Sequence, residues 1–254
     1  MRDLPTALQF ESVTKRFGDT VAVSDVSLEI TRASLVGLLG RNGAGKTTSI
    51  NMATGLMRPS AGTIHVLGLD IESNSIEVKG RIGVMPQDDS LLEYLTGAQF
   101  LQFVGRVHGL ATSVIGDRTG EIFETLELAP QPGTLVRDYS YGMKKKLALG
   151  AALIHGPELV FLDEPFEGID PVTSRTIREI LAGLQRKGVT IVMSSHVLEI
   201  VERLCDTIAI IDRGRLLAFG TLEDLRQRHG AFESLEELFV GLMGGAKPGE
   251  LSWL

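Results

Sequence analysis

Cysteine and long apolar runs are scarce in this sequence, and both absences limit what the chain can be. Its single cysteine, Cys205, cannot form an internal disulfide. The most apolar stretch, at residues 147–155, is too short to cross a bilayer as a helix. Residues 1–5 lack the basic start and apolar block of a secretion signal. We therefore expect a cytosolic chain without a transmembrane segment.

Positive charge is also in short supply. The 25 Lys and Arg residues are outnumbered by 32 Asp and Glu residues, which gives a formal net charge of −7. A mildly acidic surface argues against a protein that relies on a broad face for nucleic acid, although it leaves room for a local basic patch. The length of 254 residues fits one compact unit with a lobe or two.

Apolar patterning predicts two kinds of sheet. Short β-rich segments separated by turn signals come first, at residues 7–10, 21–30 and 63–67, and they are typical of an antiparallel sheet. Almost wholly apolar runs that precede helical patterns follow at residues 35–39, 159–162 and 189–193. Strands buried on both faces have this composition, so we expect a parallel sheet inside an α/β core.

Helical periodicity dominates residues 91–155, with Thr96 as the expected N-cap of the first helix. Asp170 and Pro171 are expected to begin another helix, and residues 197–204 a third, with Cys205 packed on its core face as an unreactive thiol.

Residues 207–211 and 216–219 predict a two-stranded ribbon that leads into two short helices. Ser234 and Glu237 are expected to form a capping box at the second of these helices. Residues 244–254 have few anchors, so Trp253 is expected to be a loosely held tail residue.

Residues 40–47 match the pattern G-x-x-x-x-G-K-[ST] between an apolar strand and a helical segment. Glycines let backbone N–H groups wrap phosphates without Cβ clashes, and the helix N-terminus adds positive potential. Lys46 would reach the β and γ phosphates of a nucleotide, and Thr47 would offer its hydroxyl to Mg²⁺. The predicted nucleotide-binding residues of this phosphate-binding loop are Gly40, Arg41, Asn42, Gly43, Ala44, Gly45, Lys46, Thr47 and Thr48.

Such a loop alone is compatible with kinases, GTPases, RecA-like motors and transport ATPases. A GTPase would carry an Asn-Lys-x-Asp guanine reader, and none of Asn42, Asn51 and Asn74 is followed by lysine. Guanine specificity is therefore unsupported, and we expect ATP and Mg²⁺ as the cofactors.

Asp163 and Glu164 directly follow a predicted buried strand. Ligands of open α/β sheets bind at the carboxyl ends of strands, so Asp163 is suited to hold the water shell of magnesium and Glu164 to polarise an attacking water. A lone acidic pair is at least as often a surface turn, and the phosphate-binding loop favours the functional interpretation. His196 follows another such strand, and Gln87 carries no signal by itself.

The order of these motifs resembles that of a known family. Phe17 precedes the phosphate-binding loop, and Gln87 lies between this loop and the helical stretch. Residues 139–143 read Tyr-Ser-Tyr-Gly-Met ahead of the two acids, and residues 167–170, Glu-Gly-Ile-Asp, precede His196. Over residues 7–220 this succession resembles the ATP-binding subunit of an ABC transporter, and most of all the exporter-type, or ABC-2, ATPases.

The resemblance implies a fold and a division of the chain. The fold is a P-loop NTPase of α/β class, with a RecA-like parallel core, an N-terminal antiparallel β subdomain and an inserted α-helical subdomain. The ATPase core with its β subdomain would occupy residues 7–88 and 156–220. The helical subdomain would take residues 89–155, and C-terminal helices and a tail would take residues 221–254 of this single domain.

The resemblance also implies roles for matching residues in hydrolysis. Phe17 would stack on adenine, and Gln87 would contact Mg²⁺ or the lytic water while sensing a membrane partner. Glu164 would be the general base, with Lys46 in the same catalytic set. His196 would contact the γ-phosphate.

Other matching residues imply a dimer. Ser140 and Gly142 would bind the γ-phosphate of ATP held by a second ATPase subunit, identical or different, and Asp170 would belong to the loop that links the two sites. The family's usual signature is Leu-Ser-Gly-Gly-Gln, so Tyr141 and Met143 depart from it. The Lys144–Lys146 triplet beyond the signature is expected to be a solvated helix face, and the alternative is that it raises the local potential for phosphate.

The expected function is ATP hydrolysis that drives transport, in the export direction, through membrane-spanning permease subunits encoded elsewhere. The chain would then act at the cytoplasmic side of the cell membrane. A short C-terminus without an added regulatory domain favours the exporter branch. The alternatives are a soluble ABC-type ATPase that acts on nucleic acid or ribosomes, and a module that binds ATP without turnover. The sequence has one ATPase cassette, no long heptad run and more acidic than basic residues, which argues against an ATPase that acts on nucleic acid or ribosomes. The presence of Glu164 argues against a module without turnover.

Overall fold

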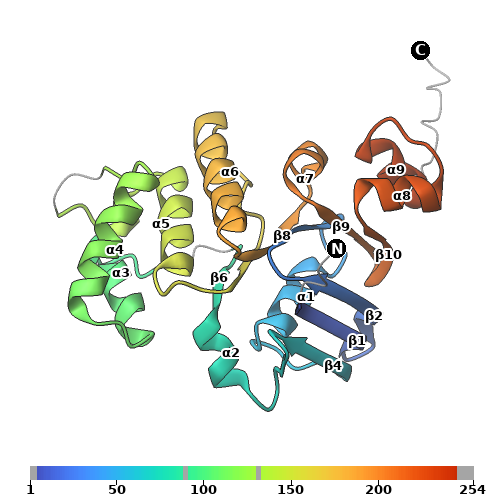
Figure 1. Ribbon diagram of the computed structural model, residues 1–254, viewed down its shortest axis with the longest axis horizontal. Coiled ribbons are helices and arrows are strands. Elements are labelled where there is room, and N and C mark those ends of the chain that lie inside the picture. The colour runs from blue at the N-terminus through green and yellow to red at the C-terminus, as the bar shows by residue number, and fades with distance from the viewer. Residues whose placement is uncertain (1–4, 88–90, 130–132, 245–254) are drawn as a thin grey trace.

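Two β-sheets organise the chain (Figure 1). A computed structural model describes residues 5–87, 91–129 and 133–244, and within these residues one sheet has four strands and the other has six. The strands of the smaller sheet lie in the order β2 (Thr20–Thr31), β1 (Thr6–Phe17), β4 (Ala61–Val66) and β5 (Leu69–Asp70). All neighbours in it are antiparallel, which confirms the antiparallel sheet predicted from the sequence.

The larger sheet is the core of the molecule. Its strands lie in the order β10 (Arg215–Gly220), β9 (Thr207–Asp212), β3 (Leu35–Leu39), β8 (Thr190–Ser195), β7 (Leu159–Leu162) and β6 (Ile82–Met85). The strands from β9 to β6 are parallel, and β10 is antiparallel to β9. Every residue of β3, β7 and β8 is buried. The three apolar runs are therefore the doubly covered parallel strands that the sequence predicts.

Two features of this sheet go beyond the sequence-based expectations. The predicted two-stranded ribbon is present as the antiparallel pair β9 and β10, and β9 also pairs in parallel with β3, from Val36 opposite Thr207 to Leu39 opposite Ile210. Strand β6 was not predicted. It follows α2 (Ser75–Arg81) directly, so no turn signal separates it from the preceding helix.

Helices surround the sheets and separate into groups along the molecule. The helical prediction for the middle of the chain is confirmed by α3 (Gly97–Val107), α4 (Thr112–Thr125), the 3₁₀ turn Val136–Asp138 and α5 (Tyr141–Leu153). The remaining helices are α1 (Lys46–Ala53), α6 (Pro171–Arg186), α7 (Leu198–Leu204), α8 (Leu222–His229) and α9 (Leu235–Leu242). Figure 1 shows α3, α4 and α5 at one end of the molecule and α8 and α9 at the other. No helix within the described ranges is both long and apolar enough to cross a bilayer.

The predicted helix caps are largely as expected. Thr96 forms a capping box with Gln99 at α3, and Asp170 accepts hydrogen bonds from the backbone of the first turn of α6. Ser234 caps α9, but the carboxylate of Glu237 accepts from the N–H of Glu233 instead of closing the predicted box.

Two other expectations concern Cys205 and Trp253. Cys205 is buried, and burial raises the pKa of its thiol, as expected of an unreactive core cysteine. Trp253 lies outside the described residues.

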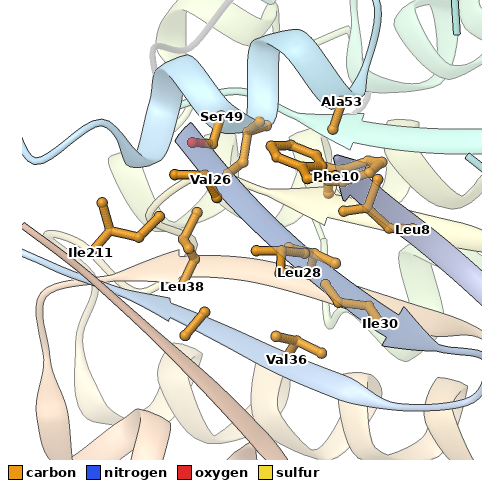
Figure 2. A pocket seen from close by; sticks show the side chains of 14 residues that line it. Leu8, Phe10, Val26, Leu28, Ile30, Val36, Leu38, Ser49, Ala53 and Ile211 are labelled. Atoms are coloured by element: carbon orange, nitrogen blue, oxygen red, sulfur yellow. The ribbon is translucent and has the colours of Figure 1, made fainter. Parts of the chain in front are cut away.

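An apolar core between the two sheets packs against α1. Figure 2 shows side chains from β1, β2, β3 and α1 pointing into one shared space, with Leu8, Phe10, Leu38 and Ala53 among them. Ser49 is the one polar side chain that lines this space, and its hydroxyl donates to the carbonyl of Gly45 at 2.9 Å. A small apolar space of this kind stays dry. It therefore belongs to the packing that holds α1 against the sheet.

His108 and His155 stack where the helical insert meets the larger sheet. Their ring centroids are 3.8 Å apart, with the planes 8° from parallel. Nε2 of His155 lies 2.9 Å from the carbonyl oxygen of Ile82 at the start of β6. Its buried Nδ1 has no hydrogen-bond partner within the described part of the chain. Burial, with His108 beside the ring, lowers the pKa of His155 to about 4.

We expect the folding stability to fall as the pH drops from about 6.5 to about 4. Unfolded histidine takes up a proton near pH 6.5, whereas folded His155 stays neutral down to about 4, so the unfolded state binds more protons in this window. Because the ring is only partly buried, we expect a loss of about 1 to 2 kcal/mol, less than full linkage gives. Denaturant unfolding at both ends of the window measures it. His155→Gln keeps a donor for Ile82 without a titrating ring and should lose less stability; an equal loss would contradict the assignment.

Candidate functional site

Loops that follow parallel strands meet at one edge of the larger sheet. The phosphate-binding loop follows β3, Gln87 follows β6, the Asp163–Glu164 pair follows β7, and His196 follows β8. The carboxyl ends of parallel strands share one edge, where open α/β sheets bind their ligands. The fold therefore brings together groups that the sequence places up to 156 positions apart, between Gly40 and His196.

A cleft at this edge gathers most of the predicted residues. It is lined by Ala22, Arg41, Asn42, Gly43, Ala44, Gly45, Lys46, Thr47, Thr48, Gln87 and Glu164. All predicted residues of the phosphate-binding loop except Gly40 are in this set. Ala22 was not predicted, because it approaches the loop from β2 through the fold and no sequence motif marks it.

The phosphate-binding loop forms a cradle of backbone groups. Gly45 has φ 110° and precedes the first residue of α1, where no side chain caps the helix. A Cβ on Gly45 would lie 2.6 Å from the carbonyl oxygen of Ala22, so only glycine fits. The uncapped N–H groups at the start of α1 are therefore free to bind an anion, and the helix dipole favours a negative charge there.

Lys46 and Glu164 form a buried ion pair beside this cradle. The Lys46 ammonium donates to the carbonyl oxygen of Gly40 at 2.7 Å and lies 3.2 Å from Oε1 of Glu164. The lysine is 6% exposed and the glutamate 4%. Oε2 of Glu164 lies 2.9 Å from Nδ1 of His196. Contacts between Lys46 and Glu164 and between Glu164 and His196 thus connect the phosphate cradle with the end of β8.

Glu164 has a backbone conformation that a non-glycine residue rarely adopts. Its φ is 49°, in the left-handed region, which costs about 1 kcal/mol or more for a residue with a side chain. Its N–H donates to the hydroxyl of Ser194 at 2.8 Å. The surrounding contacts hold this turn in place, so the direction of the carboxylate is fixed before any ligand arrives.

Asp163 is held by a residue that the sequence did not reveal. The Ser194 hydroxyl donates to Oδ1 of Asp163 at 2.5 Å, and Asp163 is 3% exposed. Ser194 thus orients both acids of the pair. Its one signal in the sequence is the polar pair Ser194-Ser195 at the end of an otherwise apolar strand, which points to no partner.

The donors near the cradle fit Mg²⁺. The described residues contain no cluster of three or more His, Cys, Asp or Glu side chains that would form a protein cage for a metal. Mg²⁺ does not need one, because it keeps several waters and binds through one or two carboxylates plus phosphates. Thr47 lines the cleft, and Asp163 directly follows β7. The buried Oε1 of Glu164 has the Lys46 ammonium at 3.2 Å and no hydrogen-bond partner among the described residues.

Six predicted site residues do not line the cleft. Gly40 and Asp163 are next to lining residues in the sequence, and His196 contacts Glu164. The other three are Phe17, Ser140 and Gly142. Ser140 caps α5 by accepting from the N–H of Met143 at 3.3 Å, and Gly142 lies next to Asp170, whose Oδ2 would be 3.7 Å from a Cβ at that glycine. Phe17 is 48% exposed, with the Lys15 ammonium 5.2 Å from the ring centroid. Within one chain, the start of α5 with Ser140 and Gly142 is therefore separate from the phosphate cleft.

Gln87 lines the cleft, and its side chain donates to Oε2 of Glu167 at 3.1 Å. The lysine triplet is placed differently from the expectation. The expected solvated face of residues 144–146 is wrong: Lys145 is fully buried, Lys146 is 8% exposed, and Lys144 pairs with Glu93. Charge alone predicts exposure, and here the packing of α5 against its neighbours overrides it.

Known proteins with a similar sequence or structure are consistent with this geometry. A sequence model of the family described as "ABC transporter" matches residues 23–167. The linearmycin resistance ATP-binding protein LnrL of Bacillus subtilis (strain 168) is 39% identical over 223 residues, which cover 88% of this chain and 72% of that protein. The Nod factor export ATP-binding protein I of Cupriavidus pinatubonensis (strain JMP 134 / LMG 1197) is 38% identical over 222 residues, 87% of this chain and 68% of that protein. A solved ATP-binding subunit of an ABC transporter superposes with a TM-score of 0.87 at 31% identity, covering 94% of this chain and 100% of that one.

Proposed function

Since this chain belongs to the ABC transporter family and is one of its ATP-binding ATPase subunits, we propose that it powers export through separate membrane-spanning subunits. It would work as a peripheral protein on the cytoplasmic face of the cell membrane. The similarity to proteins named for linearmycin resistance and for Nod factor export supports the export direction. The observation that carries the proposal is the cleft in which Lys46, Thr47 and Glu164 meet at the edge of the parallel sheet.

Each side chain of the cleft has a proposed part in ATP hydrolysis. Lys46 binds the β and γ phosphates, and Thr47 and Asp163 hold Mg²⁺, which would neutralise charge on the phosphates when bound. Glu164 accepts a proton from the attacking water, and His196 orients this carboxylate and contacts the γ-phosphate. The contacts of Lys46 and His196 with Glu164, at 3.2 and 2.9 Å, support these roles. Gln87 lines the same cleft and would reach the metal or the water from β6.

A dimer completes the proposed site. Phe17 would stack on the adenine of ATP in its own chain. Ser140 and Gly142 would bind the γ-phosphate held by a second ATPase subunit, because the N-terminus of an α-helix binds anions and Ser140 adds a hydroxyl there. Neither residue lines the cleft of its own chain, which supports binding in trans.

The membrane-spanning partner would dock in an apolar groove between the helical insert and the core. This groove is lined by Thr54, Leu56, Lys79, Ile82, Val84, Pro86, Leu91, Phe100, Val104, Val107, His108, Ala148, Ala151, Ala152 and His155. Leu56 and Val107 at its rim are 66% and 69% exposed. Exposed apolar side chains that gather in one groove favour a protein partner. We propose further that residues 89–155 form the lobe that carries one wall of this groove.

A pull-down of the tagged chain from gently solubilised membranes tests the transport proposal. We expect a protein with several membrane spans to co-purify in stoichiometric amount. Val107→Asp puts a charge into the groove and should reduce that recovery about tenfold or more, since an unpaired charge buried in an interface costs well over 1.4 kcal/mol. Val240→Asp is the matched control, because Val240 is exposed on α9, away from the groove. Recovery of soluble or ribosomal partners alone would refute the transport function and leave the ATPase site.

A further inference from the structure

Lys145 is a fully buried lysine on α5, and it contacts a loop of the candidate site. It is among the largest side chains with less than 2% exposure. Its ammonium donates to the backbone carbonyl oxygen of Gln87 at 3.1 Å. The same nitrogen lies 5.4 Å from the ring centroid of Tyr141, one helical turn earlier on α5. The lysine therefore connects α5 with Gln87, two residues beyond the end of β6.

Packing alone does not account for a lysine at this position. Burial strips the ammonium of water, and a cation in the second turn of a helix lies near the positive end of the helix dipole. Both effects disfavour the charge, whereas an apolar side chain of the same volume would fill the space without them. What lysine adds is a directional donor to Gln87 and a cation for the Tyr141 ring.

Three functional segments meet around this pair. The Tyr141 ring also covers the loop of residues 167–170, because a Cβ on Gly168 would lie 2.8 Å from a carbon of that ring. The Gln87 side chain donates to Glu167 in the same loop at 3.1 Å. Gln87, the start of α5 and the 167–170 loop are thus connected through Lys145 and Tyr141.

We propose that Lys145 is a positioning residue for ATP hydrolysis: it holds the backbone of Gln87 at a fixed position relative to the start of α5. The Gln87 side chain then enters the cleft from that position. Any shift of Gln87 is accompanied by the same shift of Ser140 at the start of α5. Lys145 acts through Gln87 and does not touch the nucleotide. This inference rests on the proposed roles of Gln87 and Ser140.

The test compares Lys145→Met with Lys144→Met in the full chain. Methionine preserves most of the volume and removes the charge and the donor. We expect Lys145→Met to lower kcat about 10- to 100-fold, the size of effect that a misplaced catalytic group produces, while KM for ATP changes less than about twofold. Lys144→Met removes a neighbouring lysine that pairs with Glu93 and should leave kcat unchanged. Lys145→Arg restores a buried donor and should recover part of the loss.

Two further readouts separate positioning from a structural role. Removing a buried charge should leave the thermal midpoint unchanged or raise it, so kcat and stability should move independently. In a Gln87→Ala background, Lys145→Met should lower kcat by a smaller factor than in the wild-type chain, because the part of its effect that passes through the Gln87 side chain is already lost. Amide hydrogen exchange of peptides that contain Gln87 should be faster in Lys145→Met than in Lys144→Met.

The outcomes that would overturn the inference are distinct from failure of the proposed function. Wild-type kcat in Lys145→Met overturns it, as does an undiminished effect in the Gln87→Ala background. A lower thermal midpoint with unchanged kcat per folded molecule assigns Lys145 a structural role only. If the wild-type chain hydrolyses no ATP, the proposed function fails. In that case, equal exchange rates at Gln87 in the two lysine variants would show that Lys145 does not hold the backbone of Gln87, and they would overturn this inference as well.

Discussion

Replacing Glu164 with glutamine is expected to preserve ATP binding and to lower the rate of hydrolysis by about two to four orders of magnitude, the usual size of a general-base effect. The amide has the shape of the carboxylate but cannot accept the proton of the attacking water. The residue is 4% exposed, and its carboxylate lies between Lys46 and His196, so few other groups can take over its part. Single-turnover hydrolysis and equilibrium binding of a fluorescent ATP analogue measure the two effects separately.

The control for this variant is an acid outside the cleft. Glu199 lies in the first turn of α7, and Glu199→Gln removes one negative charge without touching the phosphate-binding loop. It should retain wild-type turnover. Near-normal hydrolysis by Glu164→Gln would show that another group activates the water, and the assignment of the base would be wrong.

Mixing two inactive variants is expected to restore activity if the site is shared between chains. Glu164→Gln disables the half-site at the phosphate-binding loop, and Ser140→Glu disables the half-site at the start of α5 by placing a negative charge against the γ-phosphate. Each variant alone should be nearly inactive. A mixed dimer pairs both defects in one site and leaves the other site intact.

Random association of equal amounts would give mixed dimers in about half of the population, each with one working site of two. With independent sites, the recovered activity is about a quarter of the wild-type value, far above the residual activity expected of a general-base variant. The proteins should be mixed before ATP is added, and native mass spectrometry should confirm that subunits exchange. Mixed dimers without recovered activity would contradict composite sites. This experiment also shows whether the Tyr141 and Met143 departures still permit pairing of two identical chains.

The parts of the site that could be predicted from the sequence are those whose geometry is local. The phosphate-binding loop is set by glycine conformations and a helix start within a few residues, and the Thr96 and Asp170 caps are local as well. The apolar run at β7 also predicts a buried strand, and Asp163 and Glu164 directly follow its carboxyl end.

The parts that were missed depend on contacts between distant segments. Ser194 could not be assigned to Asp163 because its hydrogen bond joins β8 to β7 across 31 positions. The sequence predicts a solvent-exposed Lys145, because nothing in its own helix indicates that the carbonyl oxygen of Gln87 accepts a hydrogen bond from it. Strand β6 exists because β7 offers it a pairing edge, from Ile82 opposite Leu159 to Met85 opposite Leu162.

The pairing of Lys46 with Glu164 means that the chain carries an internal mimic of its ligand. The carboxylate lies 3.2 Å from the ammonium, in the place that the proposed role of Lys46 gives to a phosphate oxygen. In that proposed role, binding ATP exchanges one anion for another at the same ammonium. Because the Glu164 carboxylate and the phosphate compete for the same ammonium, the carboxylate positions Lys46 and at the same time lowers the affinity for ATP.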